Sequence, residues 1–164
     1  LNIVNCSSTS QEVDNEINSD TGESGIEATT RRAQELEAER QARAAAAEER
    51  IRRSALATRV FYFDFDIADF RQADRDILNF HARDLASNSN RRIRIEGHAD
   101  ERGTREYNLA LGERRGNSIV NYLIVNGASR SQIEVVSYGE ERPADRGDSE
   151  VSYQRNRRVE IIID

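Results

Sequence analysis

The chain has 164 residues, of which 37% are hydrophobic and 33% charged, so only part of it can supply a packed core. Its formal net charge of −6 argues against general nucleic-acid binding, because contacts with phosphates supply most of that affinity. The 24 basic residues are all arginine, whose planar guanidinium suits bidentate recognition of carboxylates.

Residues 1–30 form a polar N-terminal segment that contains the only cysteine, Cys6. A single cysteine excludes an internal disulfide and a cysteine-based zinc site. From residue 7 on, the segment is rich in Ser, Thr, Asn, Asp, Glu and Gly. Such a composition buries too little apolar area to offset the loss of chain entropy on folding. We therefore expect a flexible tether.

Residues 31–57 consist mainly of Ala, Glu and Arg, which are strong helix formers. Three pairs place a glutamate four residues before an arginine, an order that stabilises a helix: Glu39–Arg43, Glu48–Arg52 and Glu49–Arg53. The apolar residues make no sustained heptad, which favours a solvated, self-supported helix over a coiled coil. We expect a helical spacer, with Thr29 or Thr30 as its N-cap.

The segment from Thr58 onward has the patterns of a folded domain. Residues 60–65 are aromatic and β-rich, which predicts a strand. Residues 69–88 carry apolar side chains at helical spacing, with Asp69 as a plausible N-cap. Residues 92–97 alternate in polarity and predict a second strand.

The second half of the domain begins with a polar loop at residues 98–104. A long helix is predicted over residues 106–126, ended by Gly127. Two further strands are predicted at 133–138 and 158–163, and a short helical turn near 150–155 lies between them. The order β-α-β-α-β-β predicts an α/β (α+β) sandwich with helices packed on one face of a sheet, whose strand order this pattern leaves open.

Arg115 is the most informative residue of the long predicted helix. The 3.6-residue period places it on one face with Leu111 and Ile119, so its side chain points toward the core. A buried arginine requires an anionic partner, because an unpaired buried charge is very unfavourable. The pattern alone favours an internal carboxylate over a ligand. Asp100, in the loop after a predicted strand, is placed where it could meet a cation.

Catalytic and metal-binding interpretations have less support. His98, Asp100 and Glu101 are close in sequence, and His81 lies elsewhere, but their spacing lacks the helical geometry of known zinc motifs. A metal-dependent hydrolase that uses these residues is therefore a remote alternative. Asp64 and Asp66 lie two positions apart, on one face of the predicted strand. No constellation meets the geometric roles that catalysis needs, so we expect a protein without enzymatic activity or cofactors.

Four motifs occur in the order and spacing of a known family: VFYFDFD at 60–66, EGHADERGTREYNLALGERR at 96–115, VSYGEERP at 136–143 and NRRVEI at 156–161. They resemble the OmpA-like C-terminal domain family, and within it most closely the peptidoglycan-associated lipoproteins (Pal). The resemblance covers residues 58–164 and implies an OmpA-like fold with a mixed sheet.

The resemblance implies non-covalent binding of peptidoglycan through the diaminopimelate residue of its stem peptide. In the family pattern, Asp100 receives the ammonium group of the ligand and Arg115 receives its carboxylate. This division suits diaminopimelate, whose free end is zwitterionic and requires one anion and one planar donor. The anionic partner of Arg115 is then the ligand, in place of the internal salt bridge that the pattern alone favours.

Other family positions also match this sequence. Asn108 corresponds to an asparagine that lines the pocket, and Phe65 and Asp66 to the pocket wall after the first strand. Arg157 corresponds to the arginine of the closing motif, whose role is as much structural as ligand-binding. Two positions depart from the family: Ala99 replaces a threonine, and Ile67 replaces a residue that is often basic.

Cys6-Ser7-Ser8 resembles the start of a mature bacterial lipoprotein, although Asn5 is a poor match to the usual small residue before the cysteine. The resemblance implies a lipid anchor at Cys6, at the periplasmic face of the bacterial outer membrane. It also implies partnership with proteins of the Tol system in envelope integrity and cell division. The alternative is an OmpA-like wall anchor of another envelope machine, such as a motor stator.

Overall fold

The computed structural model describes residues 20–164, with side chains from residue 24 onward. Within this range Ala47–Asp164 forms one compact unit, and the chain before it, up to Ala46, forms another, so the two are described separately. Residues 1–19, which include Cys6 and most of the predicted tether, lie outside the described residues.

Helix α1 spans Asp20–Ala57 and therefore begins earlier than predicted. Residues 20–30, expected to be part of the tether, are helical. Thr29 and Thr30 do not cap the helix; they lie within it and donate hydrogen bonds to the carbonyls of Gly25 and Ile26 at 2.8 Å. The difference follows from cooperativity, because a helix nucleated in the Ala/Glu/Arg run extends into weaker helix formers more readily than it nucleates.

The surface of α1 carries short-range ion pairs. Glu39 pairs with Arg43 at 2.5 Å and Glu49 with Arg53 at 3.7 Å, as predicted. Arg52 instead contacts Glu49 at 3.3 Å and Asp84 of the following helix at 3.4 Å. None of the helices in the described part of the chain is long and apolar enough to cross a membrane.

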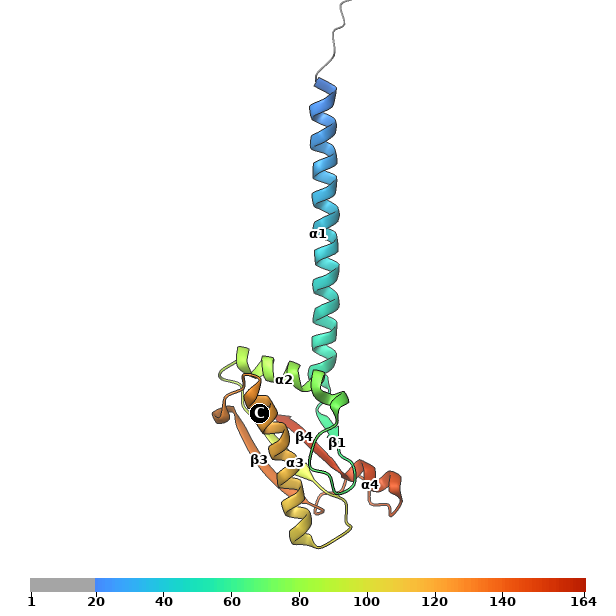
Figure 1. Cartoon of the computed structure of the whole chain (residues 1–164), viewed down its shortest axis with the longest axis vertical. Helices are drawn as coiled ribbons and strands as arrows, with labels where there is room; N and C mark the ends of the chain where they lie inside the picture. The colour runs from blue at the N-terminus through green and yellow to red at the C-terminus, as the bar shows by residue number, and fades with distance from the viewer. Residues whose placement is uncertain (1–19) are drawn as a thin grey trace, which may run out of the picture. The chain divides into compact units, whose positions relative to one another are not determined.

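Four strands form one mixed sheet in the order β1-β4-β2-β3 (Figure 1). They are β1 Val60–Tyr62, β2 Ile93–His98, β3 Ile133–Gly139 and β4 Arg158–Ile163. Strands β2 and β3 are parallel, whereas β4 is antiparallel to both of its neighbours, β1 and β2. The last strand of the sequence thus lies between the first two, and the predicted fold class is confirmed.

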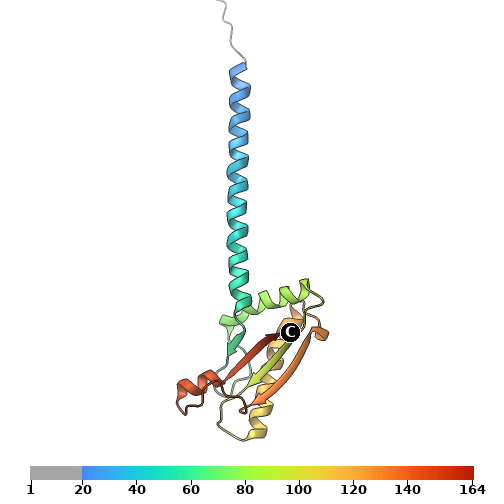
Figure 2. The same ribbon diagram turned by 180° about the vertical axis from the view of Figure 1, so that it is seen from behind.

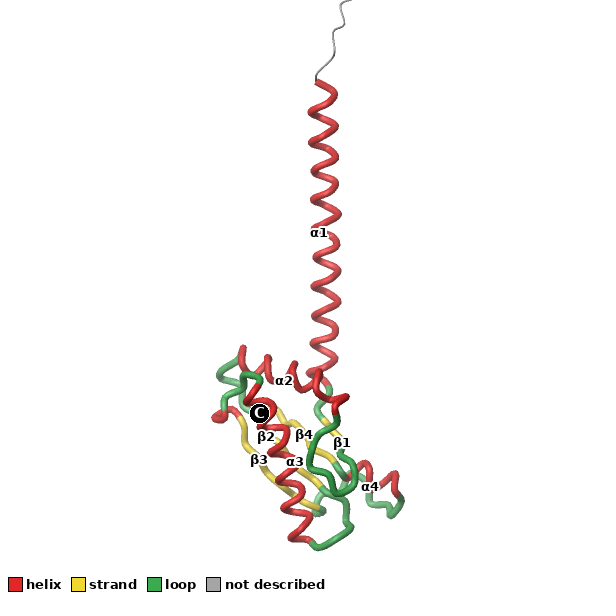
Figure 3. The backbone as a smooth tube through the Cα atoms, in the orientation of Figure 1, coloured by secondary structure: helices red, strands yellow, loops and turns green. Residues whose placement is uncertain are grey.

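Helix α3 lies along one face of the sheet, over β2 and β3, and α2 packs beside it (Figures 1 and 3). From behind, the strands lie in front of α3 (Figure 2). The two helices span Arg105–Val125 (α3) and Arg75–Ser87 (α2), and α4 spans Glu150–Asn156. The core fills the space between sheet and helices with side chains that include Phe61, Phe63, Leu78, Ile95, Ile119 and Leu123.

Two predicted boundaries near the start of the domain are wrong. Strand β1 ends at Tyr62, because the chain turns after it and Asp66 adopts a left-handed conformation, with φ 55°. Asp64 and Asp66 therefore lie in a loop and not on one strand face, and Asp64 pairs with Arg71 at 2.8 Å. Helix α2 starts at Arg75 after a 3-10 turn, so Asp69 is not its N-cap.

The predicted limits of α3 agree with the structure to within one residue. Thr104 caps its start by accepting a hydrogen bond from the backbone N–H of Tyr107 at 3.2 Å. Gly127 follows its end with φ 115°, a left-handed conformation that glycine adopts without strain. The start of α3 and the loop before it position the candidate site.

Candidate ligand-binding site

A cavity of about 250 Å³ lies where the β2–α3 loop meets the inner face of α3 and the loop after β1. Five of the six predicted ligand-binding residues line it, although they come from three separate segments of the chain. The lining residues are Phe65, Asp66, Ala99, Asp100, Arg102, Gly103, Tyr107, Asn108, Leu111 and Arg115.

A close contact between two glycines brings α3 against the end of β2. A Cβ added to Gly97 would lie 1.9 Å from the carbonyl oxygen of Gly112, so only glycine allows this approach. The contact positions the inner face of α3 directly over the carboxyl end of β2. Arg115, less than one helical turn beyond Gly112, is thereby carried to the floor of the cavity.

Arg115 is fully buried, with 0% exposure, and is held by backbone carbonyls. Its Nε donates to Ile67 at 2.8 Å, Nη1 to His98 at 3.0 Å and Nη2 to Asp64 at 3.0 Å. Among the residues that the structure describes, no carboxylate lies within 4.0 Å of this guanidinium, so the internal salt bridge favoured by the pattern is wrong. Burial lowers the pKa of Arg115 to about 10, which leaves it charged at neutral pH, and Asp100 opposes the shift.

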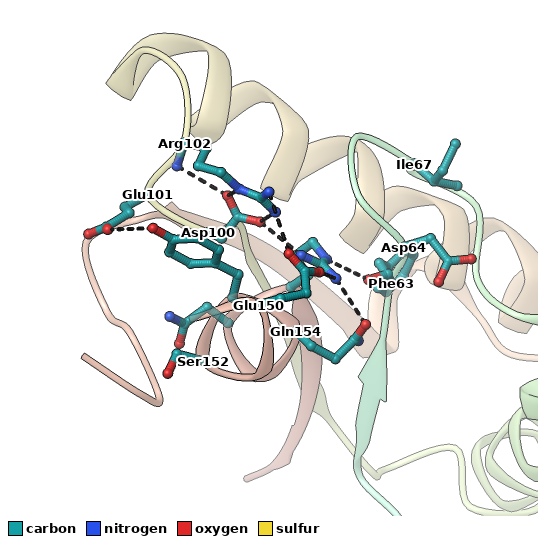
Figure 4. A network of polar contacts seen from close by, with 12 residues as sticks. Phe63, Asp64, Ile67, Asp100, Glu101, Arg102, Glu150, Ser152 and Gln154 are labelled. Atoms are coloured by element: carbon teal, nitrogen blue, oxygen red, sulfur yellow. Dashed lines mark hydrogen bonds and ion pairs between the residues drawn. The ribbon is translucent and has the colours of Figure 1, made fainter. Parts of the chain in front are cut away.

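Asp100 has the opposite environment, because it is buried but surrounded by donors. Its Oδ1 accepts from the backbone N–H and the Nε of Arg102, each at 3.1 Å (Figure 4). Its Oδ2 accepts from Nη2 of Arg102 at 2.7 Å and from Nη1 of Arg157 at 3.2 Å. Burial alone would raise the pKa of Asp100, but the hydrogen bonds from the two arginines outweigh it and hold the pKa below its usual range.

Phe65 and Asp66 lie in the loop after β1 and form one wall of the cavity. Asp66, in its left-handed conformation, accepts a hydrogen bond from the hydroxyl of Tyr107. The ring of Phe65 is exposed and lies 4.2 Å from the guanidinium carbon of Arg102, a cation–π contact. Asp66 thus has a left-handed backbone conformation at the cavity, and such conformations are frequent at functional sites.

Asn108 and Arg157 support the cavity in different ways. Asn108 is buried and donates to Oε2 of Glu140 at 2.5 Å, which fixes the orientation of its side chain. Arg157 does not line the cavity. It lies behind Asp100 and also donates to the carbonyl of Phe63 at 3.0 Å and to Glu150 at 2.8 Å. These contacts support the structural part of its predicted role, and its part in ligand binding stays a prediction.

The model of the OmpA family matches residues 62–157. The chain belongs to the OmpA family. The chain is 50% identical over 105 residues to the peptidoglycan-associated lipoprotein of Pseudomonas putida, covering 64% of this chain and 63% of that protein. It is likewise 50% identical to the protein of the same name from Pseudomonas aeruginosa, covering 64% and 62%. The chain therefore spans less than two thirds of the length of these relatives.

Solved structures agree with this assignment. The crystal structure of the peptidoglycan-associated lipoprotein from Burkholderia pseudomallei has a TM-score of 0.66 and 41% identity, covering 67% of this chain and 93% of that one. The C-terminal domain of Helicobacter pylori MotB has a TM-score of 0.59 at 22% identity, covering 64% and 83%, and shows the shared fold alone. The family predicted from the four motifs is confirmed.

Five of the ten lining residues were not among the predicted site residues, and two of these five, Tyr107 and Arg102, have polar side chains. Tyr107 precedes Leu111 and Arg115 at four-residue intervals, so the same helical period could have placed it on the cavity side. Arg102 lies in a loop, where no periodicity applies. Its guanidinium is placed by the ring of Tyr153, 4.5 Å away, and by that of Phe65, which are both distant in the sequence.

The side chains considered as metal ligands do not converge. The ring of His98 stacks on Tyr138 with centroids 5.6 Å apart, whereas Asp100 binds arginines and Glu101 accepts from Tyr153. Within residues 20–164, no group of three His, Cys, Asp or Glu residues is arranged to hold a metal ion. Burial, and next the charge of Arg158, lowers the pKa of His98 to about 4.

Proposed function

We propose that this chain binds peptidoglycan non-covalently, through the diaminopimelate residue of the stem peptide. The observation that carries the proposal is Arg115, a fully buried guanidinium at the cavity with no carboxylate within 4.0 Å among the described residues. Three of its five N–H donors bind carbonyls, which leaves two donors for a carboxylate from a ligand. Such a ligand would neutralise a charge that is otherwise very unfavourable in the interior.

The free end of diaminopimelate carries both a carboxylate and an ammonium group, and the cavity offers a charge for each. Arg115 faces the carboxylate, and Asp100 supplies the anion for the ammonium. Asn108, Asp66 and Phe65 line the remaining wall. The names of the relatives, peptidoglycan-associated lipoproteins, support peptidoglycan as the polymer that is bound.

The test is a calorimetric titration with a muropeptide that contains diaminopimelate, against one that contains lysine instead. The lysine form lacks the terminal carboxylate and therefore loses a charge-assisted hydrogen bond, which contributes ~1.5–3 kcal/mol. We therefore expect it to bind at least about tenfold more weakly. Arg115→Met should lose affinity for the first ligand by a similar factor. It should no longer distinguish the two ligands.

A matched control is Arg105→Met, because Arg105 is 71% exposed at the start of α3, pairs with Glu141 and does not line the cavity. It removes the same charge without touching the cavity and should bind like the wild type. Equal retention of wild type, Asp100→Ala and Arg115→Ala on purified peptidoglycan would reject the proposed site. Thermal unfolding of each variant separates lost binding from lost folding.

The proposal for the whole protein is an anchor between outer membrane and cell wall. In it, Cys6 carries a lipid at the periplasmic face of the outer membrane, the residues before Asp20 act as a tether and residues 20–57 act as a helical spacer. Residues 58–164 bind the wall, with proteins of the Tol system as partners during envelope constriction, and without catalysis. Mass spectrometry of Cys6 from native membranes tests the anchor, since an unmodified thiol would contradict it. No observation specifically favours another envelope machine.

A further inference from the structure

The carboxylate of Asp100 has no acceptor position left for a ligand. Each carboxylate oxygen can accept about two hydrogen bonds. Oδ1 accepts two from Arg102 (Figure 4). Oδ2 accepts one from Arg102 and one from Arg157. An ammonium group can bind Asp100 at hydrogen-bond distance only after one of these donors leaves.

The two arginines differ in how firmly they are held. The side chain of Arg157 is 4% exposed and also donates to Phe63, Glu150 and Gln154. The side chain of Arg102 is 36% exposed, lines the cavity and rests between the rings of Phe65 and Tyr153. Arg102 is therefore the donor that can move.

A second anion lies beside Arg102. Its Nη1 is 3.5 Å from Oε2 of Glu150, whose side chain is 66% exposed. The guanidinium can thus leave Asp100 without losing all charge neutralisation, because Glu150 is already within ion-pair distance. The flat rings on either side provide a surface along which it can slide.

We propose that Arg102 is an internal competitor for the ammonium subsite, so that its side chain must release Asp100 before a ligand ammonium can bind there. The proposal rests on the proposed function and adds a specificity-determining residue to it. In the free protein, Arg102 occupies the place of the ligand cation. A ligand must therefore bring both charges, a carboxylate for Arg115 and an ammonium that displaces Arg102.

The test is the substitution Arg102→Met, which keeps a long side chain between the two rings and removes the competing charge. The apparent affinity equals the intrinsic affinity multiplied by the fraction of protein in which Asp100 is free of Arg102. If the arrangement with Arg102 on Asp100 is in about tenfold excess, its removal should tighten binding by about tenfold. We expect this gain, with a faster association rate, for a diaminopimelate muropeptide. The same peptide acetylated on that amine should show little or no gain, because it has no ammonium charge to pair with the vacated carboxylate.

The control is Arg105→Met, which removes the same charge at the start of α3. Arg105 is 71% exposed, pairs with Glu141 and does not line the cavity, so binding should not change. Arg102→Lys, which leaves part of the carboxylate free, should give a smaller gain and stands in if the methionine variant does not fold.

The outcomes separate the two proposals. Wild-type protein that does not bind the diaminopimelate muropeptide would remove the proposed function and this inference with it. If the wild type binds and Arg102→Met binds equally well or more weakly, the inference is overturned, but the proposed function is not. Weaker binding would make Arg102 a ligand contact, and an equal gain for the acetylated peptide would show a general effect on the cavity.

Discussion

At the scale of residues, the cavity holds two buried charges that are satisfied in opposite ways. Asp100 accepts four hydrogen bonds from two arginines, whereas Arg115 donates hydrogen bonds only to the backbone carbonyls of Asp64, Ile67 and His98 among the described residues. Carbonyls orient a guanidinium but do not neutralise it. The site is therefore electrostatically incomplete at its basic end, as the proposed carboxylate ligand requires.

A third buried group, His98, gives a prediction for the dependence of stability on pH. Neither ring nitrogen has a hydrogen-bond partner in the described part of the chain, and burial, then Arg158, lowers the pKa to about 4. An unfolded histidine has a pKa of about 6.5, so between these values the unfolded state binds more protons. The free energy of unfolding should therefore fall as pH decreases through this window. Below it, both states are protonated and the contribution does not change further.

The measurement compares urea unfolding of the wild type and His98→Leu at pH 7 and pH 4.5. The wild type should lose more stability on acidification. The pH dependence of its free energy of unfolding should exceed that of the variant by an amount approaching about 1.4 kcal/mol per pH unit. Other titrating groups are common to both proteins and cancel. Parallel pH dependences would contradict the role of His98. At pH 7 the variant should be at least as stable, because the unpartnered nitrogens are removed.

At the scale of elements, the contact of β2 with α3 determines where Arg115 lies. Gly97→Ala would place a Cβ 1.9 Å from the backbone of Gly112, which cannot rotate away as a side chain can. We expect a loss of at least about 1–3 kcal/mol in the free energy of unfolding, together with weaker ligand binding as α3 moves from the strand. Urea unfolding and muropeptide titration measure both effects.

Gly116→Ala is the comparison for this prediction. An added Cβ there would meet only side-chain methyl groups, at 3.1 Å from Val135 and 3.6 Å from Ile95. These groups can adjust, and alanine favours a helix interior over glycine by about 1 kcal/mol. The variant should be much less destabilised than Gly97→Ala. Equal losses would show that the glycine contact does not specifically set the position of α3.

The same elements show what the sequence could predict. The period of Leu111, Arg115 and Ile119 correctly gave the helix and the inward direction of Arg115, because helical geometry depends on local spacing. The carbonyls that bind Arg115 have no signature in the sequence, so its internal partners were not predictable. Arg102 was missed for a related reason, since Phe65 and Tyr153 place it only in the folded chain.

The errors around β1 and α2 have a tertiary cause as well. Aromatic alternation continues to Phe65, but β1 ends earlier because the chain turns to present its carbonyls to Arg115. Phe70 fits the helical period of α2, yet it lies before the helix and packs edge-to-face on Tyr122, with ring centroids 5.0 Å apart. In both places the apolar pattern extends beyond the regular element, because loop residues also contribute to the core.

At the scale of the whole molecule, the sequence motifs and the compact unit give different starting residues for the domain. The motifs place its start at Thr58, whereas the compact unit begins at Ala47 and includes the last turns of α1. Within this unit Ala55 is buried, and Arg52 contacts the buried Asp84 of α2. These contacts predict that residues 47–57 stabilise the domain in addition to connecting it.

Two truncations test this prediction. Residues 47–164 should unfold at the same temperature as residues 20–164, because the cavity and core lie within the compact unit. The chain of residues 58–164 should have a free energy of unfolding lower by about 1 kcal/mol and should unfold at a temperature at least roughly 4 °C lower. The reason is that the surface covered by Ala55 becomes exposed. All three should bind the muropeptide alike, since no cavity residue is removed. Equal stability of the two shorter chains would instead assign residues 47–57 to the spacer and place the start of the domain at Thr58.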